Sequence, residues 1–259
     1  MSAAASYKVL VAGATGACGQ AIVRELVATP RCEEVIALCR RANVRLPFAD
    51  AGKVRVIVLE DFGELTLTPA ERRSKDCPLW SLSGVGAAVC ALGTTMKDAG
   101  GSKEVFQRVD HDYICGFVRT ALACGARKIA LISASGASER SLFFYMRVKG
   151  ETEKHVQALC AEYGAALHIL RPGMLLTPPR TSGASRPAER AAQQLVKTLR
   201  LSMGGILAVS VEHVAKTVRM ALETAPEELL QRFSSLEEQA SQTWVYPSRT
   251  IFRIGAEAG

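Results

Sequence analysis

The sequence predicts an α/β fold in which helices cover both faces of a doubly wound, parallel sheet. Stretches of strand length alternate with stretches of helix length through most of the chain, which is typical of successive βαβ units. The first strand, near 7–12, runs directly into a glycine-rich turn and then a helix. A chain of 259 residues is long enough for one large domain with a substantial core. We therefore expect a single Rossmann-fold domain over 1–259, with 174–259 forming mostly a substrate-side lid and C-terminal helices.

Apolar, β-branched runs mark the strands of the alternating region, because parallel strands are buried on both faces. These strands are expected near 7–12, 34–39, 53–59, 86–91, 127–133 and 166–170. Helices are expected near 18–29, 103–124 and 145–163. The stretch 62–84 is rich in Leu, Thr, Ser and Pro, and we expect an irregular excursion with a short helix there.

The alternation breaks after Arg171-Pro-Gly173. Residues 177–190 hold three prolines, one glycine and several Ser, Thr and Arg, which is typical of a loop or mobile lid. Beyond it we expect a helix near 188–199, a short strand near 206–209, helices near 211–223 and 226–240, and a late strand within 244–254.

The glycine-rich turn predicts a dinucleotide cofactor. Gly13 allows a tight turn, Gly16 lets the backbone approach a pyrophosphate, and Gly19 lets the helix lie close to the strand. Amide groups at the N-terminus of this helix would then point at the phosphates. Three glycines at this spacing can also form only a tight turn, so the residues around them are needed to support a cofactor site.

The end of the second strand favours NADP(H). Arg40 and Arg41 follow it directly, at the carboxyl edge of the sheet where ligands bind, and an arginine there can accommodate a 2′-phosphate. Glu33 and Glu34 stand at the other end of the strand, too far away to take the ribose hydroxyls of NAD. The alternative is that the two arginines are solvated surface charges.

The composition excludes several classes of protein. Charged residues make up 22% and hydrophobic residues 48% of the chain, as in ordinary globular proteins. The net charge of +7 suits an anionic cofactor, but the basic residues are too scattered to predict a nucleic-acid partner. No apolar run is long enough to span a bilayer. The N-terminal Met-Ser-Ala-Ala-Ala-Ser lacks the basic region of a signal peptide, and we expect a cytoplasmic protein.

Neither the cysteines nor the histidines predict a metal site. The eight cysteines form no CxxC pair and no spacing suited to zinc, and we expect free, buried thiols. The four histidines are isolated along the chain, with His111 and His155 expected on helix surfaces and His168 within a strand. Ordinary structural roles are expected for these three and for His213.

Tyr145 and Lys149 are the best candidates for catalytic residues. Residues four apart share one face of a helix, so the phenol and the ammonium group meet. The nearby positive charge favours the phenolate, which lets Tyr145 exchange a proton near neutral pH. Lys149 can also hold the nicotinamide ribose hydroxyls. A surface pair is the alternative, but here the motif follows a complete nucleotide-binding half.

A serine at the end of the preceding strand would complete the site. Ser133 and Ser135 lie in Ile132-Ser-Ala-Ser-Gly136, at the carboxyl edge of the sheet. A hydroxyl there can donate a hydrogen bond to a substrate carbonyl. Ser133 is favoured because it lies where the strand stops, and a serine in a tight turn is the alternative for both.

Together these motifs resemble the short-chain dehydrogenase/reductase superfamily in its atypical branch, and most of all the Tat-interactive protein 2 (TIP30/CC3) oxidoreductase family. The resemblance extends over roughly 7–215. Its further segments are Leu92-Gly-Thr-Thr95, Arg108-Val-Asp-His-Asp-Tyr113, Tyr145-x-x-Val-Lys-Gly-Glu151, Arg171-Pro-Gly-x-Leu-Leu176 and Ser185-Arg-Pro187.

The resemblance implies a site for each part of NADPH. It implies NADPH contacts from Thr15, Gly16, Ala17 and Cys18, and from Arg40 and Arg41 around the 2′-phosphate. Asp61 and Phe62 would flank the adenine, Leu92 and Gly93 would pass over the cofactor, and Leu175 and Arg186 would approach the nicotinamide end. It also implies that Tyr145 is the proton donor and that Lys149 binds the ribose.

Two positions depart from the family pattern. Asp110 stands where the superfamily often has an asparagine that holds a proton-relay water, and Ser133-Ala134 replaces two adjacent serines. The leading hypothesis is an NADPH-dependent reductase of a small carbonyl substrate. The alternative is an NADP(H)-binding regulatory or redox-sensing protein that acts through protein partners, because relatives are associated with transcription, nuclear transport and cell death. A sugar-nucleotide epimerase ranks last, since the chain has no obvious second domain for a nucleotide-sugar.

Overall fold

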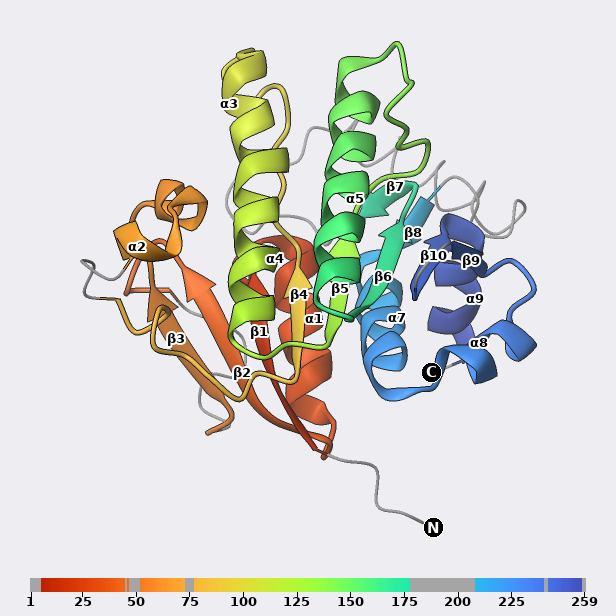
Figure 1. The fold of residues 1–259 in the computed structure, drawn as a ribbon. Coiled ribbons are helices and arrows are strands. Elements are labelled where there is room, and N and C mark those ends of the chain that lie inside the picture. Colours follow the sequence, from red (N-terminus) through yellow and green to blue (C-terminus); the bar gives the residue numbers. More distant parts are fainter. Residues whose placement is uncertain are drawn as a thin grey trace, which may run out of the picture.

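The computed structural model describes residues 6–44, 46, 52–72, 77–177, 208–239 and 242–257, which form a sheet between two layers of helices (Figure 1). The eight-stranded sheet has the order β3-β2-β1-β4-β5-β6-β10-β9. All neighbouring strands are parallel except β10 and β9, which are antiparallel. This arrangement confirms the predicted doubly wound α/β fold.

The first six strands of this sheet in chain order lie close to their predicted positions, and two further strands, β9 and β10, come from the C-terminal part. They are β1 (Tyr7–Ala12), β2 (Cys32–Cys39), β3 (Val54–Val58), β4 (Ala87–Cys90), β5 (Lys128–Ile132), β6 (Ala166–Arg171), β9 (Glu237–Gln239) and β10 (Thr243–Pro247). A separate pair of short parallel strands, β7 (Met174–Leu176) and β8 (Ala208–Ser210), follows the break in the alternation.

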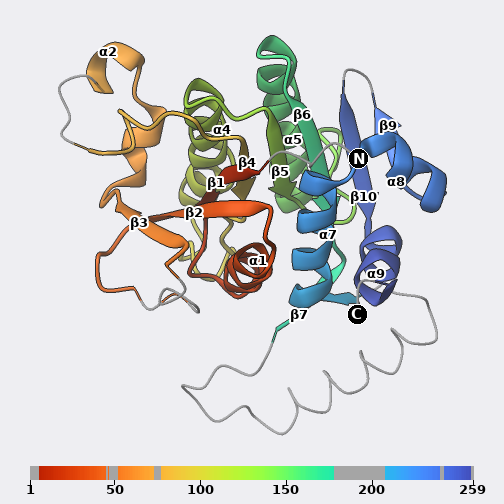
Figure 2. The same cartoon turned by 90° about the horizontal axis from the view of Figure 1, so that it is seen from below.

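Helices cover both faces of the sheet, as the view from below shows (Figure 2). One face carries α1 (Ala17–Ala28), α7 (Val211–Glu223) and α9 (Ser248–Glu257). The other carries α4 (Tyr113–Ala123) and α5 (Phe144–Glu162). The shorter helices are η2 (Phe62–Thr66), α2 (Pro69–Arg72), α3 (Lys103–Gln107), the π-helical turn η3 (Arg108–Asp112) and α8 (Pro226–Arg232).

Two hydrophobic cores result, one on each face. Successive side chains of a strand point to opposite faces, so Val9 and Val11 of β1 join the core beneath α1 and α7, while Leu10 and Ala12 join the core beneath α4 and α5. All four are fully buried. The central strands therefore read as continuous apolar runs, which is why the sequence predicts them well.

Two predictions for the C-terminal part hold only in part. The helix expected over 226–240 ends at Arg232, and Glu237–Gln239 instead forms β9, paired with β10. The strand expected within 244–254 ends at Pro247, where α9 begins. Ile251 and Ile254 lie three residues apart and are both fully buried, as the inner face of a helix requires.

The helix expected near 188–199, and all but Thr177 of the lid expected over 177–190, lie outside the described residues. Within the part of the chain that the structure describes, no helix has the length and apolar character needed to cross a membrane.

Candidate functional site

The glycine turn between β1 and α1 has the geometry that the sequence predicts. Gly13 has φ of +81°, and a β-carbon there would collide with the carbonyl oxygen of Ala91 on the neighbouring chain segment after β4. A β-carbon on Gly19 would collide with the carbonyl of Gly13. The Gly16 amide closes the turn by donating to the Gly13 carbonyl over 3.0 Å. The helix therefore starts directly against the strand end.

A cavity of about 400 Å³ opens above this turn, at the carboxyl edge of the sheet. Seven of the predicted cofactor residues line it: Gly13, Thr15, Gly16, Arg40, Phe62, Leu92 and Gly93. Residues that the sequence did not predict also line it, among them Thr94, Asp98, Val109 and Tyr113. The lining residues thus come mainly from the ends of β1, β2 and β4 and from α3, η3 and α4.

A second cavity of about 300 Å³ adjoins it and shares two lining residues, Thr15 and Arg40. Its remaining lining residues are Arg41, Asn43 and Val44, so among the residues that the structure describes two arginines and no acidic residue line it. An anionic group of a nucleotide bound in the larger cavity would meet positive charge here.

Other predicted cofactor contacts lie beside these cavities or outside the described part of the chain. Ala17 and Cys18 begin α1, and burial raises the pKa of the Cys18 thiol to about 12. The Asp61 carboxylate caps η2 by accepting the Gly63 amide over 2.7 Å. Leu175 lies in β7. Arg186 falls outside the described residues.

Lys149 forms a buried ion pair with Asp110. Its Nζ lies 2.7 Å from Asp110 Oδ1, and the two side chains are 6% and 0% exposed. The other carboxylate oxygen of Asp110 accepts the Thr94 amide over 2.8 Å. The backbone of Gly93 runs past both groups, since a β-carbon there would lie 3.4 Å from Asp110 Oδ1 and 3.6 Å from Lys149 Nζ. The pair thus lies under the Leu92–Thr94 segment that lines the cavity.

Asp110 is the residue whose role the sequence did not predict. It occupies the position where an asparagine was expected, and here it orients the candidate catalytic lysine instead. Asp110 lies in η3, a π-helical turn, and such turns occur frequently at functional sites. The carbonyl of Asp110 accepts a hydrogen bond from Thr152 Oγ1 over 2.8 Å, which ties this turn to α5 a second time.

Tyr145 lies one helical turn before Lys149 on α5, as predicted. Its ring packs against Phe106 of α3, with 5.5 Å between the ring centroids, and Phe106 is fully buried. The tyrosine side chain is therefore held by an apolar contact, while its partner Lys149 is held by an ion pair.

Ser133 directly follows β5 and has a buried hydroxyl. It is 7% exposed, and its Oγ has no hydrogen-bond partner among the residues that the structure describes. Leaving a buried hydroxyl unpaired costs about 1–3 kcal/mol, so the group is available for a ligand. Ser135 is exposed, which favours Ser133 between the two candidates.

The loop after β5 is fixed against α5. The Ser138 amide donates to the Met146 carbonyl over 3.1 Å, and a β-carbon on Gly150 would collide with the backbone of Ser138 and Glu139. Arg171, at the end of β6, adds a bidentate pair with the buried Glu153 of α5, at 3.0 and 2.5 Å. The elements that carry Ser133, Tyr145 and Lys149 are thus joined together.

The prediction that the histidines are isolated is wrong for two of them. His111 Nε2 and His155 Nδ1 lie 2.7 Å apart, and the Cys115 thiol lies beside them. The sequence concealed this group because the two histidines are 44 residues apart. His168 is structural, since it is fully buried and bonded to Tyr246 Oη over 2.9 Å.

A protein-family model and several relatives of known sequence match this chain. A protein-family model described as NAD(P)H-binding matches residues 13–224. The protein named "Protein fmp52, mitochondrial" of Emericella nidulans is 35% identical over 185 residues, covering 71% of this chain and 72% of the relative. "Protein HTATIP2" of Rattus norvegicus is 30% identical over 210 residues, covering 81% and 78%.

Solved structures agree on the fold. An oxidoreductase of the short-chain dehydrogenase/reductase family from Burkholderia thailandensis superposes with a TM-score of 0.60 at 19% identity, covering 98% of this chain and 94% of that one. MoeE5 in complex with UDP-glucose and NAD gives 0.55 at 19% identity, covering 84% and 72%. At this identity the likeness shows the fold alone.

These comparisons correct the expected location. Fungal relatives from several species are named as mitochondrial proteins, which contradicts the prediction of a cytoplasmic protein. That prediction rested on the absence of a signal peptide, which says nothing about mitochondria. The glycine turn, the cavity above it and the relatives agree on a nicotinamide dinucleotide as cofactor. The chain belongs to the NAD(P)H-binding family, among the atypical short-chain dehydrogenase/reductases related to HTATIP2 and FMP52.

Proposed function

We propose that this protein is an NADPH-dependent reductase of a small carbonyl substrate, with Tyr145 as the proton donor. The observation that carries the proposal is the buried Asp110–Lys149 pair. It lies beneath the segment that lines the nucleotide cavity and one helical turn from Tyr145. Burying an ion pair costs free energy of desolvation, and nucleotide binding alone does not require such a pair at this position. A role in proton transfer does require a lysine that is held in place.

NADP(H) rather than NAD(H) is favoured by the smaller cavity. Arg40 and Arg41 both line it, and within the described ranges no acidic residue does. A guanidinium group can pair with a phosphate through two hydrogen bonds, whereas the ribose hydroxyls of NAD prefer a carboxylate. Thr15 and Arg40 line both cavities, so a 2′-phosphate in the smaller one would be continuous with a nucleotide in the larger one.

The cofactor, when bound, supplies a hydride to the carbonyl carbon. The protein supplies orientation and proton transfer. Ser133 Oγ donates a hydrogen bond to the carbonyl oxygen and thereby polarises it. Tyr145 Oη gives its proton to that oxygen as negative charge develops there. The Lys149 ammonium stabilises the phenolate that remains, and Asp110 keeps the ammonium in place. We also propose that Leu175 and Arg186 contact the cofactor near its nicotinamide.

The test is oxidation of NADPH by the purified protein across a panel of aldehydes, ketones and quinones. Tyr145→Phe removes the transferable proton and is expected to lower kcat by at least about 100-fold, as loss of a general acid does. Tyr163→Phe is the matched control, because Tyr163 caps the far end of the same helix. Tight NADPH binding without turnover on any substrate would overturn the reductase proposal. It would favour the regulatory alternative.

The cofactor assignment has its own test. Binding of NADPH and NADH is measured for the wild type and for Arg40→Ala and Arg41→Ala. Each substitution is expected to weaken NADPH binding by at least about tenfold, since it removes a charge-assisted hydrogen bond worth about 1.5–3 kcal/mol, and to leave NADH binding unchanged. Arg127→Ala, at the opposite edge of the sheet just before β5, is the control. Equal affinities for both cofactors before and after substitution would show that the phosphate assignment is wrong.

A mitochondrial location completes the proposal, and it rests on the names of the fungal relatives. Fractionation of cells that express the tagged protein, followed by protease protection of the mitochondrial fraction, tests it. Recovery in the cytosolic fraction would contradict it.

A further inference from the structure

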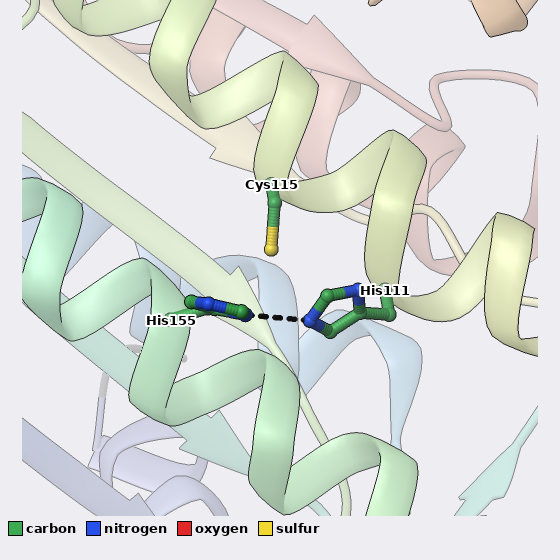
Figure 3. A group of neighbouring side chains, drawn as sticks. All are labelled: His111, Cys115 and His155. Atoms are coloured by element: carbon green, nitrogen blue, oxygen red, sulfur yellow. Dashed lines mark hydrogen bonds between the residues drawn. The ribbon is translucent and has the colours of Figure 1, made fainter. Parts of the chain in front are cut away.

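We propose that His111, Cys115 and His155 form a binding site for a zinc ion, separate from the nucleotide site. The three side chains come from two helices that lie side by side on one face of the sheet, η3–α4 and α5 (Figure 1). Their potential ligand atoms all lie within 4.8 Å of one another. Figure 3 shows the two imidazole rings meeting between the helices, with the Cys115 side chain pointing toward the same place.

The donor set suits zinc. Two imidazoles and one thiolate are borderline-soft ligands, and zinc sites with three protein ligands keep a fourth position for water. With Zn–N of about 2.0–2.1 Å and Zn–S of about 2.3 Å, ligand atoms of one tetrahedral ion lie roughly 3.3–3.7 Å apart. The two ring nitrogens at 2.7 Å would therefore have to separate slightly. His155 is exposed, so its ring can turn to allow this.

The surroundings of His111 are those of a metal ligand. Its Nδ1 lies 2.8 Å from Asp112 Oδ1. Because a carboxylate only accepts hydrogen bonds, this contact places the ring hydrogen on Nδ1 and leaves the lone pair on Nε2 facing His155. A histidine that ligates a metal usually donates its other N–H to a carboxylate in this way. Asp112 is half exposed and adds a negative charge beside the cation.

Cys115 completes the set from one turn further along the helix. It is 8% exposed, and burial raises the pKa of its thiol to about 12, an effect that the Arg119 charge partly opposes. Binding of a cation would replace the thiol proton, which passes to water, and form a metal–sulfur bond. A cavity of about 380 Å³ connects the group with solvent, and Arg119 and Glu162 also line it. In the part of the chain that the structure describes, no residue lines both this cavity and the nucleotide cavity.

The proposed ion would fix η3 against α5. Lys149 and Thr152 of α5 already bind Asp110 of that turn, and His155 meets the next residue, His111. A bound ion would replace the direct contact between the two rings by two bonds to a common centre. The ion would thus link the two helices, with one coordination position left open to water.

The test uses metal-depleted full-length protein. Zinc affinity is measured by competition with a chromophoric chelator, and cobalt(II) serves as a spectroscopic probe, because a thiolate–cobalt charge-transfer band reports the Cys115 bond. We expect one ion per chain, and a melting temperature that rises with zinc. Loss of an outer carboxylate typically weakens binding 10–100-fold, so Asp112→Asn should cost about tenfold, and Cys115→Ser or His155→Ala at least about 100-fold.

Cys124→Ser is the matched control, because Cys124 is also buried and lies at the end of the same helix. It should bind zinc as the wild type does. His155 is exposed, so His155→Ala should fold normally even if Cys115→Ser does not. Absence of zinc binding by the wild type would overturn the proposal. So would an affinity that stays unchanged in His155→Ala, or a cobalt spectrum without the thiolate band.

Discussion

The buried ion pair between Asp110 and Lys149 makes the sharpest prediction about this protein. The carboxylate is fully buried, the ammonium is 6% exposed, and the two charged atoms lie 2.7 Å apart. Asp110→Asn and Lys149→Met each leave one charge buried without its partner. Both variants should unfold more easily than the wild type, even though neither removes much volume.

The expected magnitude follows from this burial. Removing one partner of a buried pair costs about 3–5 kcal/mol, which is a large share of the 5–15 kcal/mol that stabilises a typical domain. Asparagine still accepts the Thr94 amide that Asp110 accepts now at 2.8 Å, so Asp110→Asn isolates the loss of charge. The double variant Asp110→Asn/Lys149→Met holds no unpaired charge and should be at least as stable as either single variant.

Urea unfolding of the four proteins, followed by circular dichroism, measures these differences. The Lys154–Glu139 pair on the same helix is the control, since its side chains are 69% and 40% exposed and Lys154→Met should change stability little. Turnover gives an independent reading, because both single variants should lose NADPH oxidation. If the double variant lost the sum of the two single losses, the two charges would not be coupled and the reasoning would be refuted.

Two other predictions concern the core and the glycine turn. Burial, reinforced by the Lys128 charge, lowers the pKa of His168 to about 3, whereas a histidine in the unfolded chain has about 6.5. As the pH falls, the unfolded state therefore binds the proton first. The free energy of unfolding should fall by about 1.4 kcal/mol per pH unit as the pH drops from about 6.5 toward 3. Urea midpoints measured over this pH range test this, and the same dependence on pH in His168→Gln and the wild type would contradict it. Gly19→Ala places a methyl group on the Gly13 carbonyl, so it should lower the free energy of unfolding by about 1–3 kcal/mol. It should also abolish NADPH binding in a fluorescence titration. Unchanged binding would show that the turn tolerates a wider helix–strand spacing.

The sequence predicted those parts of the fold that depend on local pattern. The apolar run before Gly13 and the glycine spacing were enough to locate β1 and α1, and α7 has the predicted bounds of 211–223. The segment after Arg232 was mispredicted because its structure depends on a distant partner. Glu237–Gln239 is a strand only because β10 lies beside it, and its sequence, Glu-Glu-Gln, has little strand propensity of its own.

The same distinction separates the predicted and the missed parts of the site. Tyr145 and Lys149 could be placed one turn apart on a single helix from the sequence, because residues four apart share a helix face. Asp110 and His111 could not be assigned, because their partners, Lys149 and His155, lie on another helix. The family pattern often has an asparagine at position 110, where it holds a proton-relay water. This chain has Asp110 there, which carries a charge and binds Lys149 directly.

The π-helical turn η3 explains how one short segment serves both proposed sites. It brings Asp110 and His111, which are neighbours in the chain, to successive positions along α5. Lys149 pairs with the Asp110 carboxylate, Thr152 donates to the Asp110 carbonyl, and His155 meets the His111 ring. The three α5 residues are spaced three apart, so their contacts with η3 follow one another along the helix. They run from Lys149, beside the nucleotide cavity, to His155, which lines the cavity of the proposed zinc site. Loss of the His111–His155 contact should therefore alter the position of Lys149. We expect this to change the rate of NADPH turnover in His155→Ala, and an unchanged rate would contradict the coupling.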